Sequence, residues 1–527
     1  MDYDDQMVYA YTMLRSVPEL LRHFQELYPY ICVDEAQDTS KIQHAIIALL
    51  ASGSENLFMV GDEDQSIYGF RAAYPEALLT FEKNYPDAKV LLMEENFRSD
   101  ARIVLAADRF IQKNTLRHEK HMKAARKPAS DIREISLRSR KAQYTYLAKL
   151  AEGCTSQTAI LYRDNECILP LVDLLERNGI PYQMRNAELS FFSHRTILDI
   201  INIIKLAQNP MDTEAFLQIY YKIGTYLRKQ DAIRIARISE EKRIPVLDVA
   251  AEDSDLNGHV LGSVRSMRTH LQNLLQDSGE RAIYRIMQFM GYQEYLNRSG
   301  LSDSKLEILR ILGSRADSPM ELAERLEQLK VLIREKEPDR KCPLILSTIH
   351  ASKGLEYDSV YLIDVADGIL PESIPQNLHQ ASAEELKAYE EERRLFYVGV
   401  TRAKDHLTLF TTNRPSTFCS EFLGKSSVTE EGRKNLMPVE SRISRTFKQA
   451  RPYAAVAGIR QTKASEELYF RLKEELGTGV IVEHKKYGEG VVTQLDDRLV
   501  HIMFQDDTLR MMDLKILANA GLLKVKK

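Results

Sequence analysis

Two short polar motifs each follow an apolar run near the start of the chain. Tyr30–Val33 leads into Asp34 and Glu35, and Leu57–Val60 leads into the loop Gly61–Arg71. Adjacent carboxylates suit a hard cation and a water, because one can hold Mg²⁺ while the other orients or deprotonates the attacking water. An acidic pair at a strand end is equally often a solvated turn, so the pair alone does not identify a site.

The loop that follows the second run combines several functional groups. It carries the amide Gln65, the aromatic residues Tyr68 and Phe70, and the guanidinium of Arg71. A polar turn with aromatic residues in the core is the alternative interpretation. Only the combination with other motifs favours a binding site.

Buried parallel strands with polar carboxyl ends would position these groups. Alternation of strands and helices predicts a doubly wound sheet, in which ligands bind at the carboxyl edge. The apolar runs predict strands at Tyr30–Val33, Leu57–Val60, Lys89–Met93, Leu344–Thr348, Ser359–Asp364 and His406–Thr411. The motifs therefore fall where ligands are expected to bind.

Five segments in order resemble motifs II to VI of superfamily-one DNA helicases of the UvrD/PcrA/Rep type. They are DEAQDTS (34–40), VGDEDQSIYGFRAA (60–73), MEENFRS (93–99), LSTIHASKGLEYDSVYLIDVADGILPE (346–372) and EEERRLFYVGVTRAK (390–404). Weaker similarities are LYRDN (161–165), FFSHRTILDI (191–200) and HKKYGEGVV (484–492). The resemblance therefore extends over nearly the whole chain.

The resemblance implies a site for ATP and Mg²⁺. Asp34 would hold Mg²⁺, Glu35 would activate the hydrolytic water, and Gln65 would sense the γ-phosphate. The remaining nucleotide contacts implied are Phe97 on adenine, Glu356 on the ribose, Lys353 and Gly354 in the same loop, and Arg98 and Arg402 on the γ-phosphate. Guanidinium groups suit this last role because they stabilise charge on the transferring phosphoryl group.

Contacts with single-stranded DNA are implied in the same way. Tyr68 and Phe70 would stack on bases, a contact worth about 1–3 kcal/mol per base, with Arg71 beside them. Phe70 stands where a Trp is common in the family, and the chain contains no Trp. Thr348 and His350 would lie near the DNA backbone. The basic run 117–127 predicts a solvated helix face, with phosphate contacts as the alternative.

One motif of the family is missing from the sequence. The phosphate-binding loop G-x-x-x-x-G-K-[ST] does not occur, and Gly424-Lys425-Ser426 lacks the first glycine because Cys419 stands there. We therefore expect the chain to begin inside the first motor domain, with a sheet short of strands and ATP turnover severely reduced without a separate P-loop-bearing chain. A truncated gene model, a frameshift and a split enzyme would each explain this equally.

Composition limits the class of protein. The 527 residues are 44% hydrophobic and 28% charged with a net charge of −4, which is typical of a soluble protein of several domains without a global basic field. The five cysteines form no C-x-x-C pair, which argues against a zinc site and a disulfide framework. The first residues do not resemble a signal peptide, and no apolar run is long enough to span a membrane. We expect a cytoplasmic protein with no membrane partner.

The predicted fold is α/β, with two RecA-like parallel-sheet lobes of which the first is incomplete, an inserted helical subdomain and a small C-terminal Tudor-like β-barrel. The predicted boundaries are 1–105 for the first motor domain, 106–189 and 341–425 for the second, 190–340 for the helical insertion, 426–475 for a linker and 476–527 for the barrel. The segment Glu280–Asn297 illustrates the helical pattern of the insertion.

The sequence therefore predicts an ATP-dependent 3′-to-5′ DNA helicase that acts at junctions of single-stranded and duplex DNA in repair or replication. A non-catalytic DNA-binding or adaptor relic of such a helicase is the alternative. The resemblance suggests RNA polymerase or another protein as a partner of the barrel, although small barrels also bind nucleic acid.

Overall fold

The structure is a computed structural model, in which the chain divides into two units, Met1–Thr429 and Glu430–Lys527. The described residues are 2–185, 190–337, 339, 341–378, 380–412, 416–425, 476, 480–485, 487–495, 499–504, 509–513, 517 and 523–525. The predicted linker, 426–475, lies outside them.

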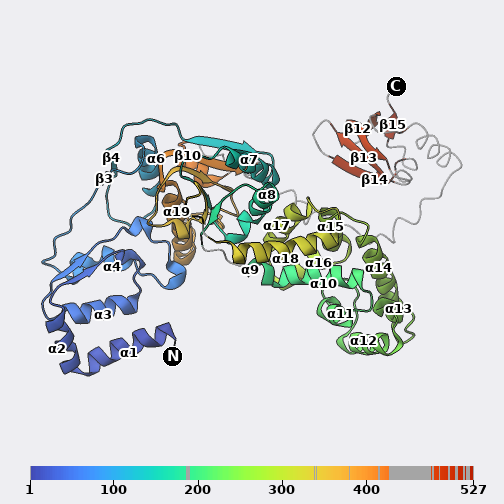
Figure 1. Ribbon diagram of the computed structural model, residues 1–527, viewed down its shortest axis with the longest axis horizontal. Helices are drawn as coiled ribbons and strands as arrows, with labels where there is room; N and C mark the ends of the chain where they lie inside the picture. Colours follow the sequence, from blue (N-terminus) through green and yellow to red (C-terminus); the bar gives the residue numbers. More distant parts are fainter. Residues whose placement is uncertain are drawn as a thin grey trace. The chain divides into compact units, whose positions relative to one another are not determined.

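The first unit begins with a small α/β lobe, drawn in blue in Figure 1. Strands β1 (Ile31–Val33) and β2 (Leu57–Met59) pair in parallel, as the apolar runs predict, with Cys32 opposite Phe58. Helices α1 (Tyr3–Ser16), α2 (Pro18–Leu27) and α3 (Lys41–Ala51) accompany them. A capping box starts α3, because the Ser40 hydroxyl accepts from the Gln43 amide while the Gln43 side chain accepts from Ser40 N.

The third strand predicted for this lobe is wrong. Lys89–Met93 has no ladder partner among the described residues, and Leu91 and Met93 are 84% and 94% exposed. The pairing begins two residues later, where β3 (Glu95–Asn96) lies parallel to β4 (Lys123–Ala124). An apolar run forms a strand only where a neighbour satisfies its backbone groups.

A second, larger α/β lobe follows and has a six-stranded parallel sheet of order β5-β10-β9-β6-β8-β7. Its strands are β5 (Arg133–Leu137), β6 (Thr158–Tyr162), β7 (Gln183–Met184), β8 (Leu344–Thr348), β9 (Tyr357–Leu362) and β10 (Ala403–Thr412). The strands predicted at Leu344–Thr348, Ser359–Asp364 and His406–Thr411 are confirmed as β8, β9 and β10, the last two with shifted ends.

Both faces of this sheet are covered. Ile160 and Tyr162 of β6 pack with α7 (Arg140–Glu152) and α8 (Leu169–Arg177). Ala159 and Leu161 point the other way, toward a core of residues from α6 (Ala101–Ile111), α19 (Ala383–Val400) and α20 (Thr417–Phe422). The alternation explains why all five residues of β6 are buried.

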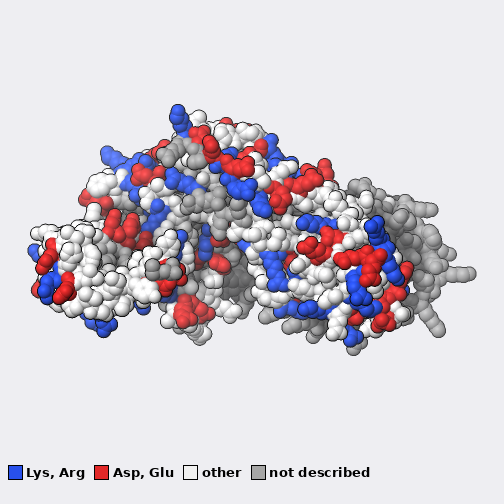
Figure 2. Space-filling model, turned by 60° about the horizontal axis from the view of Figure 1, so that its bottom comes forward, with Lys and Arg blue, Asp and Glu red and all other residues white. Residues whose placement is uncertain are grey.

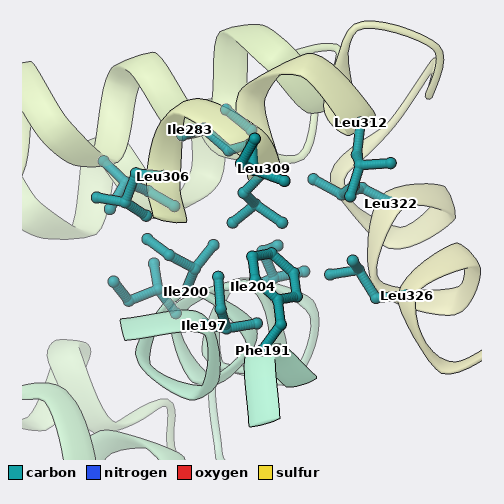
Figure 3. Close-up of a cluster of buried hydrophobic side chains, with 14 of the residues drawn as sticks. Phe191, Ile197, Ile200, Ile204, Ile283, Leu306, Leu309, Leu312, Leu322 and Leu326 are labelled. Carbon is teal, nitrogen blue, oxygen red and sulfur yellow. The ribbon is translucent and has the colours of Figure 1, made fainter. Parts of the chain in front are cut away.

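Between β7 and β8 the chain forms helices, with no strand among the described residues from 190 to 337. The helices are α9 (Ser190–Ser193), α10 (Arg195–Gln208), α11 (Thr213–Ile219), α12 (Lys229–Lys242), α13 (Val246–Ala251), α14 (Gly258–Leu274), α15 (Gly279–Phe289), α16 (Tyr292–Ser299), α17 (Ser304–Gly313) and α18 (Pro319–Glu335). Figure 3 shows Ile200 and Ile204 of α10 converging with Leu306 and Leu309 of α17 in a buried hydrophobic core. The helical character predicted for this segment is therefore present.

The second unit contains an antiparallel sheet of order β14-β13-β12-β11-β15. Its strands are β11 (Ile481–His484), β12 (Gly488–Leu495), β13 (Leu499–Phe504), β14 (Leu509–Asp513) and β15 (Leu523–Val525). Val482, Val492, Val500 and Ile502 form its core. The antiparallel strands agree with the alternating sequence pattern, whereas closure into a Tudor-like barrel stays a prediction. Among the described residues no helix is long and apolar enough to cross a bilayer.

Candidate functional site

The acidic pair lies immediately after β1. Glu35 has a left-handed backbone (φ 50°), which is uncommon for a residue with a side chain, and the Asp34 carboxylate accepts from Glu35 N at 2.9 Å. Both residues are exposed, and the Glu35 side chain is 56% exposed. The turn therefore leaves two carboxylates accessible at the carboxyl edge of the strand.

Gln37 connects this turn to the loop after β2, and sequence reasoning assigned it no role. Its Nε2 donates to Glu35 Oε2 at 2.5 Å, and its Oε1 accepts from Asp62 N at 2.9 Å. Its backbone oxygen accepts from the Ser66 hydroxyl. Gln37 is buried, so its amide is committed to these bonds. The only available signal was its place within the motif DEAQD.

Gln65 and Arg402 meet although 337 residues separate them in the chain. Gln65 Nε2 donates to Asp62 Oδ2 at 2.7 Å, and Gln65 Oε1 accepts from an Arg402 terminal nitrogen at 3.4 Å. Arg402 also donates to the carbonyl oxygens of Val398 and Leu355, at 3.0 and 3.2 Å.

Arg402 is a buried cation that forms no ion pair among the described residues. Its side chain is 1% exposed, and no carboxylate among the described residues forms an ion pair with it. Burial, and next the neighbouring Arg98, lower the pKa of Arg402 to about 10. Burying an unpaired charge is costly, so a buried guanidinium held by carbonyl oxygens is suited to bind an anion that offsets this cost.

Lys353 brings the same loops together from the second lobe. Its buried Nζ donates to Asp38 at 2.5 Å and to the Gln65 carbonyl oxygen at 2.7 Å, and lies 3.7 Å from Glu35 Oε2. The next residue, Gly354, has φ +77°, a conformation that glycine adopts without strain. Glu35, Gln65, Lys353 and Arg402 thus form one connected group.

Arg98 lies on the other side of Arg402 and pairs with Glu356. Arg98 Nε and Lys404 Nζ each contact Glu356 at 2.9 Å, and together Lys404 and Arg98 lower the pKa of Glu356. Phe97, next to Arg98, is 70% exposed. The carboxylate expected to bind ribose is therefore ion-paired, while the ring expected to stack on adenine is accessible.

The residues expected to bind DNA form an aromatic cluster. Phe70 meets His350 edge to face at 5.5 Å and lies 5.9 Å from Tyr68, and the Arg71 guanidinium is 5.2 Å from the Tyr68 ring centroid. Phe70 is 69% exposed, so its ring is free to stack. Thr348 differs, because it is buried and its hydroxyl accepts from Ala351 N.

The loop Gly61–Arg71 is held by α19 of the second lobe. Gly69 N donates to Glu391 Oε1 at 2.8 Å, and Arg394 Nε donates to the Ser66 carbonyl oxygen at 2.9 Å. A Cβ at Gly69 would lie 2.4 Å from the Glu391 carboxylate, so a larger residue here would require the flexible Glu391 side chain to shift. Glu391 and Arg394 were missed as site residues, although both lie in the motif that contains Arg402.

The basic run 117–127 contains no helix, so the predicted solvated helix face is wrong. Arg117 pairs with Asp64, and both side chains are nearly buried, at 6% and 3% exposed. Lys120 contacts Asp62 and Glu63. The acidic loop after β2 attracts these cations into the protein, where they are not available to DNA phosphates.

Comparisons with known proteins agree with this arrangement. A family model described as the UvrD/REP helicase N-terminal domain matches residues 1–86, and one described as the UvrD-like helicase C-terminal domain matches residues 91–414. The chain is 31% identical over 425 residues to the protein YjcD of Bacillus subtilis (strain 168), a match that covers 77% of this chain and 55% of YjcD.

It is also 28% identical over 533 residues to the ATP-dependent DNA helicase PcrA of Staphylococcus epidermidis, and 26% identical over 535 residues to that of Staphylococcus aureus. Each of these matches covers 94% of this chain and 70% of the relative. The chain thus spans about half the length of YjcD (55%) and 70% of the PcrA proteins. Since the C-terminal domain model alone matches more than half of its residues, the chain belongs to the UvrD-like helicase family.

Proposed function

We propose that the chain is the motor region of an ATP-dependent DNA helicase that moves 3′ to 5′ on single-stranded DNA and opens junctions in repair or replication. The observation that carries this proposal is the buried, unpaired Arg402 held against Gln65, close to the exposed Glu35. A terminal phosphate of ATP would supply the missing negative charge.

The residues of the site fit the steps of phosphoryl transfer. Glu35 accepts a proton from the attacking water and Gln65 senses the γ-phosphate, while Arg402 and Arg98 stabilise charge on the transferring group. Phe97 stacks on adenine. Glu356 must exchange at least one of its ion pairs to bind ribose.

Mg²⁺, which neutralises phosphate charge when bound, fits Asp34 alone. Among the described residues no group of three or more acidic, His or Cys side chains could hold a metal ion. Mg²⁺ commonly uses one or two carboxylates together with waters and substrate phosphates, so the exposed carboxylate of Asp34 is sufficient on the protein side.

Single-stranded DNA would bind at the aromatic cluster. Phe70 and Tyr68 offer ring faces, and Arg71 adds positive charge beside them. The contact of Tyr68 Oη with the His350 carbonyl oxygen joins this cluster to the second lobe at 3.1 Å. Movement between the lobes during the ATP cycle would therefore move the stacked bases.

The test is phosphate release from ATP with and without single-stranded DNA, by the chain alone and with a P-loop-bearing polypeptide added. We expect Arg402→Ala to lower kcat by about 10³-fold or more, as for other arginines that stabilise phosphoryl transfer. Arg237→Ala is the matched control, because Arg237 is 73% exposed on α12 and pairs only with Glu241 among the described residues.

Duplexes with a 3′ or a 5′ single-stranded tail then test polarity, and only the 3′-tailed substrate should be unwound. Absence of hydrolysis in both arms, with DNA binding retained, would contradict the proposal and favour the non-catalytic adaptor function. Equal activity of Arg402→Ala and Arg237→Ala would also contradict it.

A further inference from the structure

Residues 117–126, here called the basic strap, contact three separate loops of the candidate site. The strap lies outside the segments that carry the site residues. Its cations reach the loop after β2, the loop that contains Arg98, and the start of β10. One short segment thus connects the surroundings of Gln65, Arg98 and Arg402.

The first end of the strap holds the loop after β2. Arg117 makes a two-pronged contact with Asp64, from Nε to Oδ1 at 3.0 Å and from a terminal nitrogen to Oδ2 at 2.8 Å. His118 N donates to Glu63 Oε1 at 2.8 Å. Paired contacts of this kind restrict orientation as well as distance.

Lys120 reaches the carboxylate that orients Gln65. Lys120 Nζ donates to Asp62 Oδ1 at 2.7 Å, and Gln65 Nε2 donates to Asp62 Oδ2 at 2.7 Å. Burial by itself would lower the pKa of Lys120, but the carboxylates of Asp62, Asp64 and Glu63 raise it well above its usual value. Lys120 is therefore a permanent cation against this loop.

The orientation of the Gln65 amide depends on that contact. An amide has a donor end and an acceptor end, so holding Nε2 on Asp62 leaves Oε1 to face Arg402. A rotated Asp62 would release Nε2 and allow the amide to turn. Lys120 contacts Asp62, Asp62 contacts Gln65, and Gln65 contacts Arg402, so the four residues form one continuous series.

The second end of the strap contacts the backbone of Arg98 and of Lys404, two residues after Arg402. β4 pairs with β3, and Lys123 Nζ donates to Glu94 Oε2 at 2.7 Å. Arg126 donates to the carbonyl oxygens of Arg98 at 2.6 Å and of Lys404 at 3.2 Å, and pairs with Asp405. Arg126 thus joins the backbone next to Arg98 to the strand that follows Arg402.

We propose that the strap is a positioning element of the site and that Lys120 is a positioning residue, which sets the side-chain orientation of Gln65 through Asp62. The inference rests on the proposed ATP hydrolysis for its catalytic consequence. If the ion pairs were purely structural, their removal would lower the stability of the protein, and the effect on turnover would not depend on Gln65.

Hydrogen exchange followed by mass spectrometry tests the positioning without nucleotide. In Lys120→Ala we expect faster exchange in the peptide 61–66, whereas Lys120→Arg should behave like the wild type. Lys127→Ala is the matched control, since Lys127 is exposed and forms no ion pair within the described part of the chain. Asp62→Asn keeps the shape of that side chain and should reproduce the effect of Lys120→Ala. Unchanged exchange in both variants would overturn the proposal.

A double-mutant cycle on ATP turnover tests the route through Gln65. We expect Lys120→Ala to lower kcat by roughly 10- to 100-fold with little change in KM, because small misplacements in an active site have effects of that size. Added to Gln65→Ala, the same substitution should lower kcat no further. Additive losses would overturn the positioning role. Absence of turnover in the wild type would contradict the proposed function instead, and hydrogen exchange would still report whether Lys120 holds the loop after β2.

Discussion

At the scale of single residues, the site contains two features that cost free energy in the folded protein. Arg402 is buried and forms no ion pair within the described part of the chain, and Glu35 adopts a left-handed backbone. Arg402 contacts Gln65, and Lys353 lies near both Glu35 and Gln65. Their coincidence favours a binding role for the group, because an anionic ligand would offset the cost of the buried Arg402 charge.

His350 shows how the same surroundings set a protonation state. Burial, followed by the positive charge of Arg163, lowers its pKa to about 4 from an ordinary value of 6.5. The imidazole is therefore neutral at pH 7, and its T-shaped contact with Phe70 does not involve a cation. Contact with DNA through this ring should not depend on pH between 6 and 8.

The sign of the effect on stability follows from this shift. Folding favours neutral His350, so its contribution is fully present above pH 6.5 and is lost as the pH falls toward 4. We expect the wild type to lose unfolding free energy relative to His350→Gln over this window, as measured by urea unfolding at pH 7.0, 5.5 and 4.5. Parallel pH profiles of the two proteins would show that the His350 pKa is not lowered.

At the scale of elements, the best prediction was of strands whose apolar runs lie in the sheet interior. The run predicted at Leu344–Thr348 coincides with β8 at both ends, because all five residues of the strand are buried. β6 was missed although all five of its residues are buried, and β5 was missed since REISL is partly exposed and has little apolar character. Lys89–Met93 was wrong for the opposite reason: its residues are apolar, but no described neighbour pairs with them.

Site residues divide in a similar way. Gln65, Lys353 and Arg402 were named from motifs, and the structure brings them into contact. Lys120 could not be assigned, because its partner Asp62 lies 58 residues away and nothing local indicates the pair. Sequence patterns predict which residue types are present, whereas ion pairs between distant segments follow from the packing of lobes and loops.

A second group of aromatic rings, around Phe110 of α6, allows the packing of the second lobe to be tested. Phe110 is fully buried and lies 4.9 Å from Phe396 of α19, 5.4 Å from Phe418 and 5.9 Å from Phe422 of α20. We expect Phe110→Ala to lower the unfolding free energy by about 3–5 kcal/mol, the usual cost of removing a buried phenyl ring.

Leu105→Ala is the control on the same helix, because Leu105 is 62% exposed and should change stability by less than about 0.5 kcal/mol. Thermal and urea unfolding followed by circular dichroism would measure both variants. A similar loss of unfolding free energy in the two variants would mean that the Phe110 ring contributes no more to stability than an exposed side chain. ATP turnover is not needed for this test.

At the scale of the whole molecule, the numbers of positive and negative side chains nearly balance, with 72 Lys and Arg against 76 Asp and Glu. The net charge is −4, and Figure 2 shows Lys and Arg intermingled with Asp and Glu over the face in view. Long-range attraction to DNA is therefore weak. Binding should depend on local contacts such as the ring of Phe70, and its salt dependence should be modest for a nucleic-acid-binding protein.

The two-stranded sheet of the first lobe has one apolar face in solvent. Tyr30 and Cys32 alternate onto the same face as Phe58 and Val60, and these residues are exposed, with Tyr30 at 75% and Phe58 at 61%. Parallel sheets are almost always covered on both faces, as the sheet of the second lobe is. The exposed face is therefore a surface that another polypeptide could cover.

Cys32 reports on this face directly, since all five cysteines are free and differ in burial. In dilute solution we expect an alkylating reagent to modify Cys32 fully, Cys154 partly, and the buried Cys167, Cys342 and Cys419 hardly at all, as measured by mass spectrometry of peptides. Addition of a polypeptide that covers this face should slow the reaction at Cys32 and leave Cys154 unchanged. Self-association through the same face would instead make Cys32 protection rise with the concentration of the chain. Rapid modification of Cys32 under every condition would show that nothing present covers β1 and β2, and the exposed face would then be a lasting feature of the lobe.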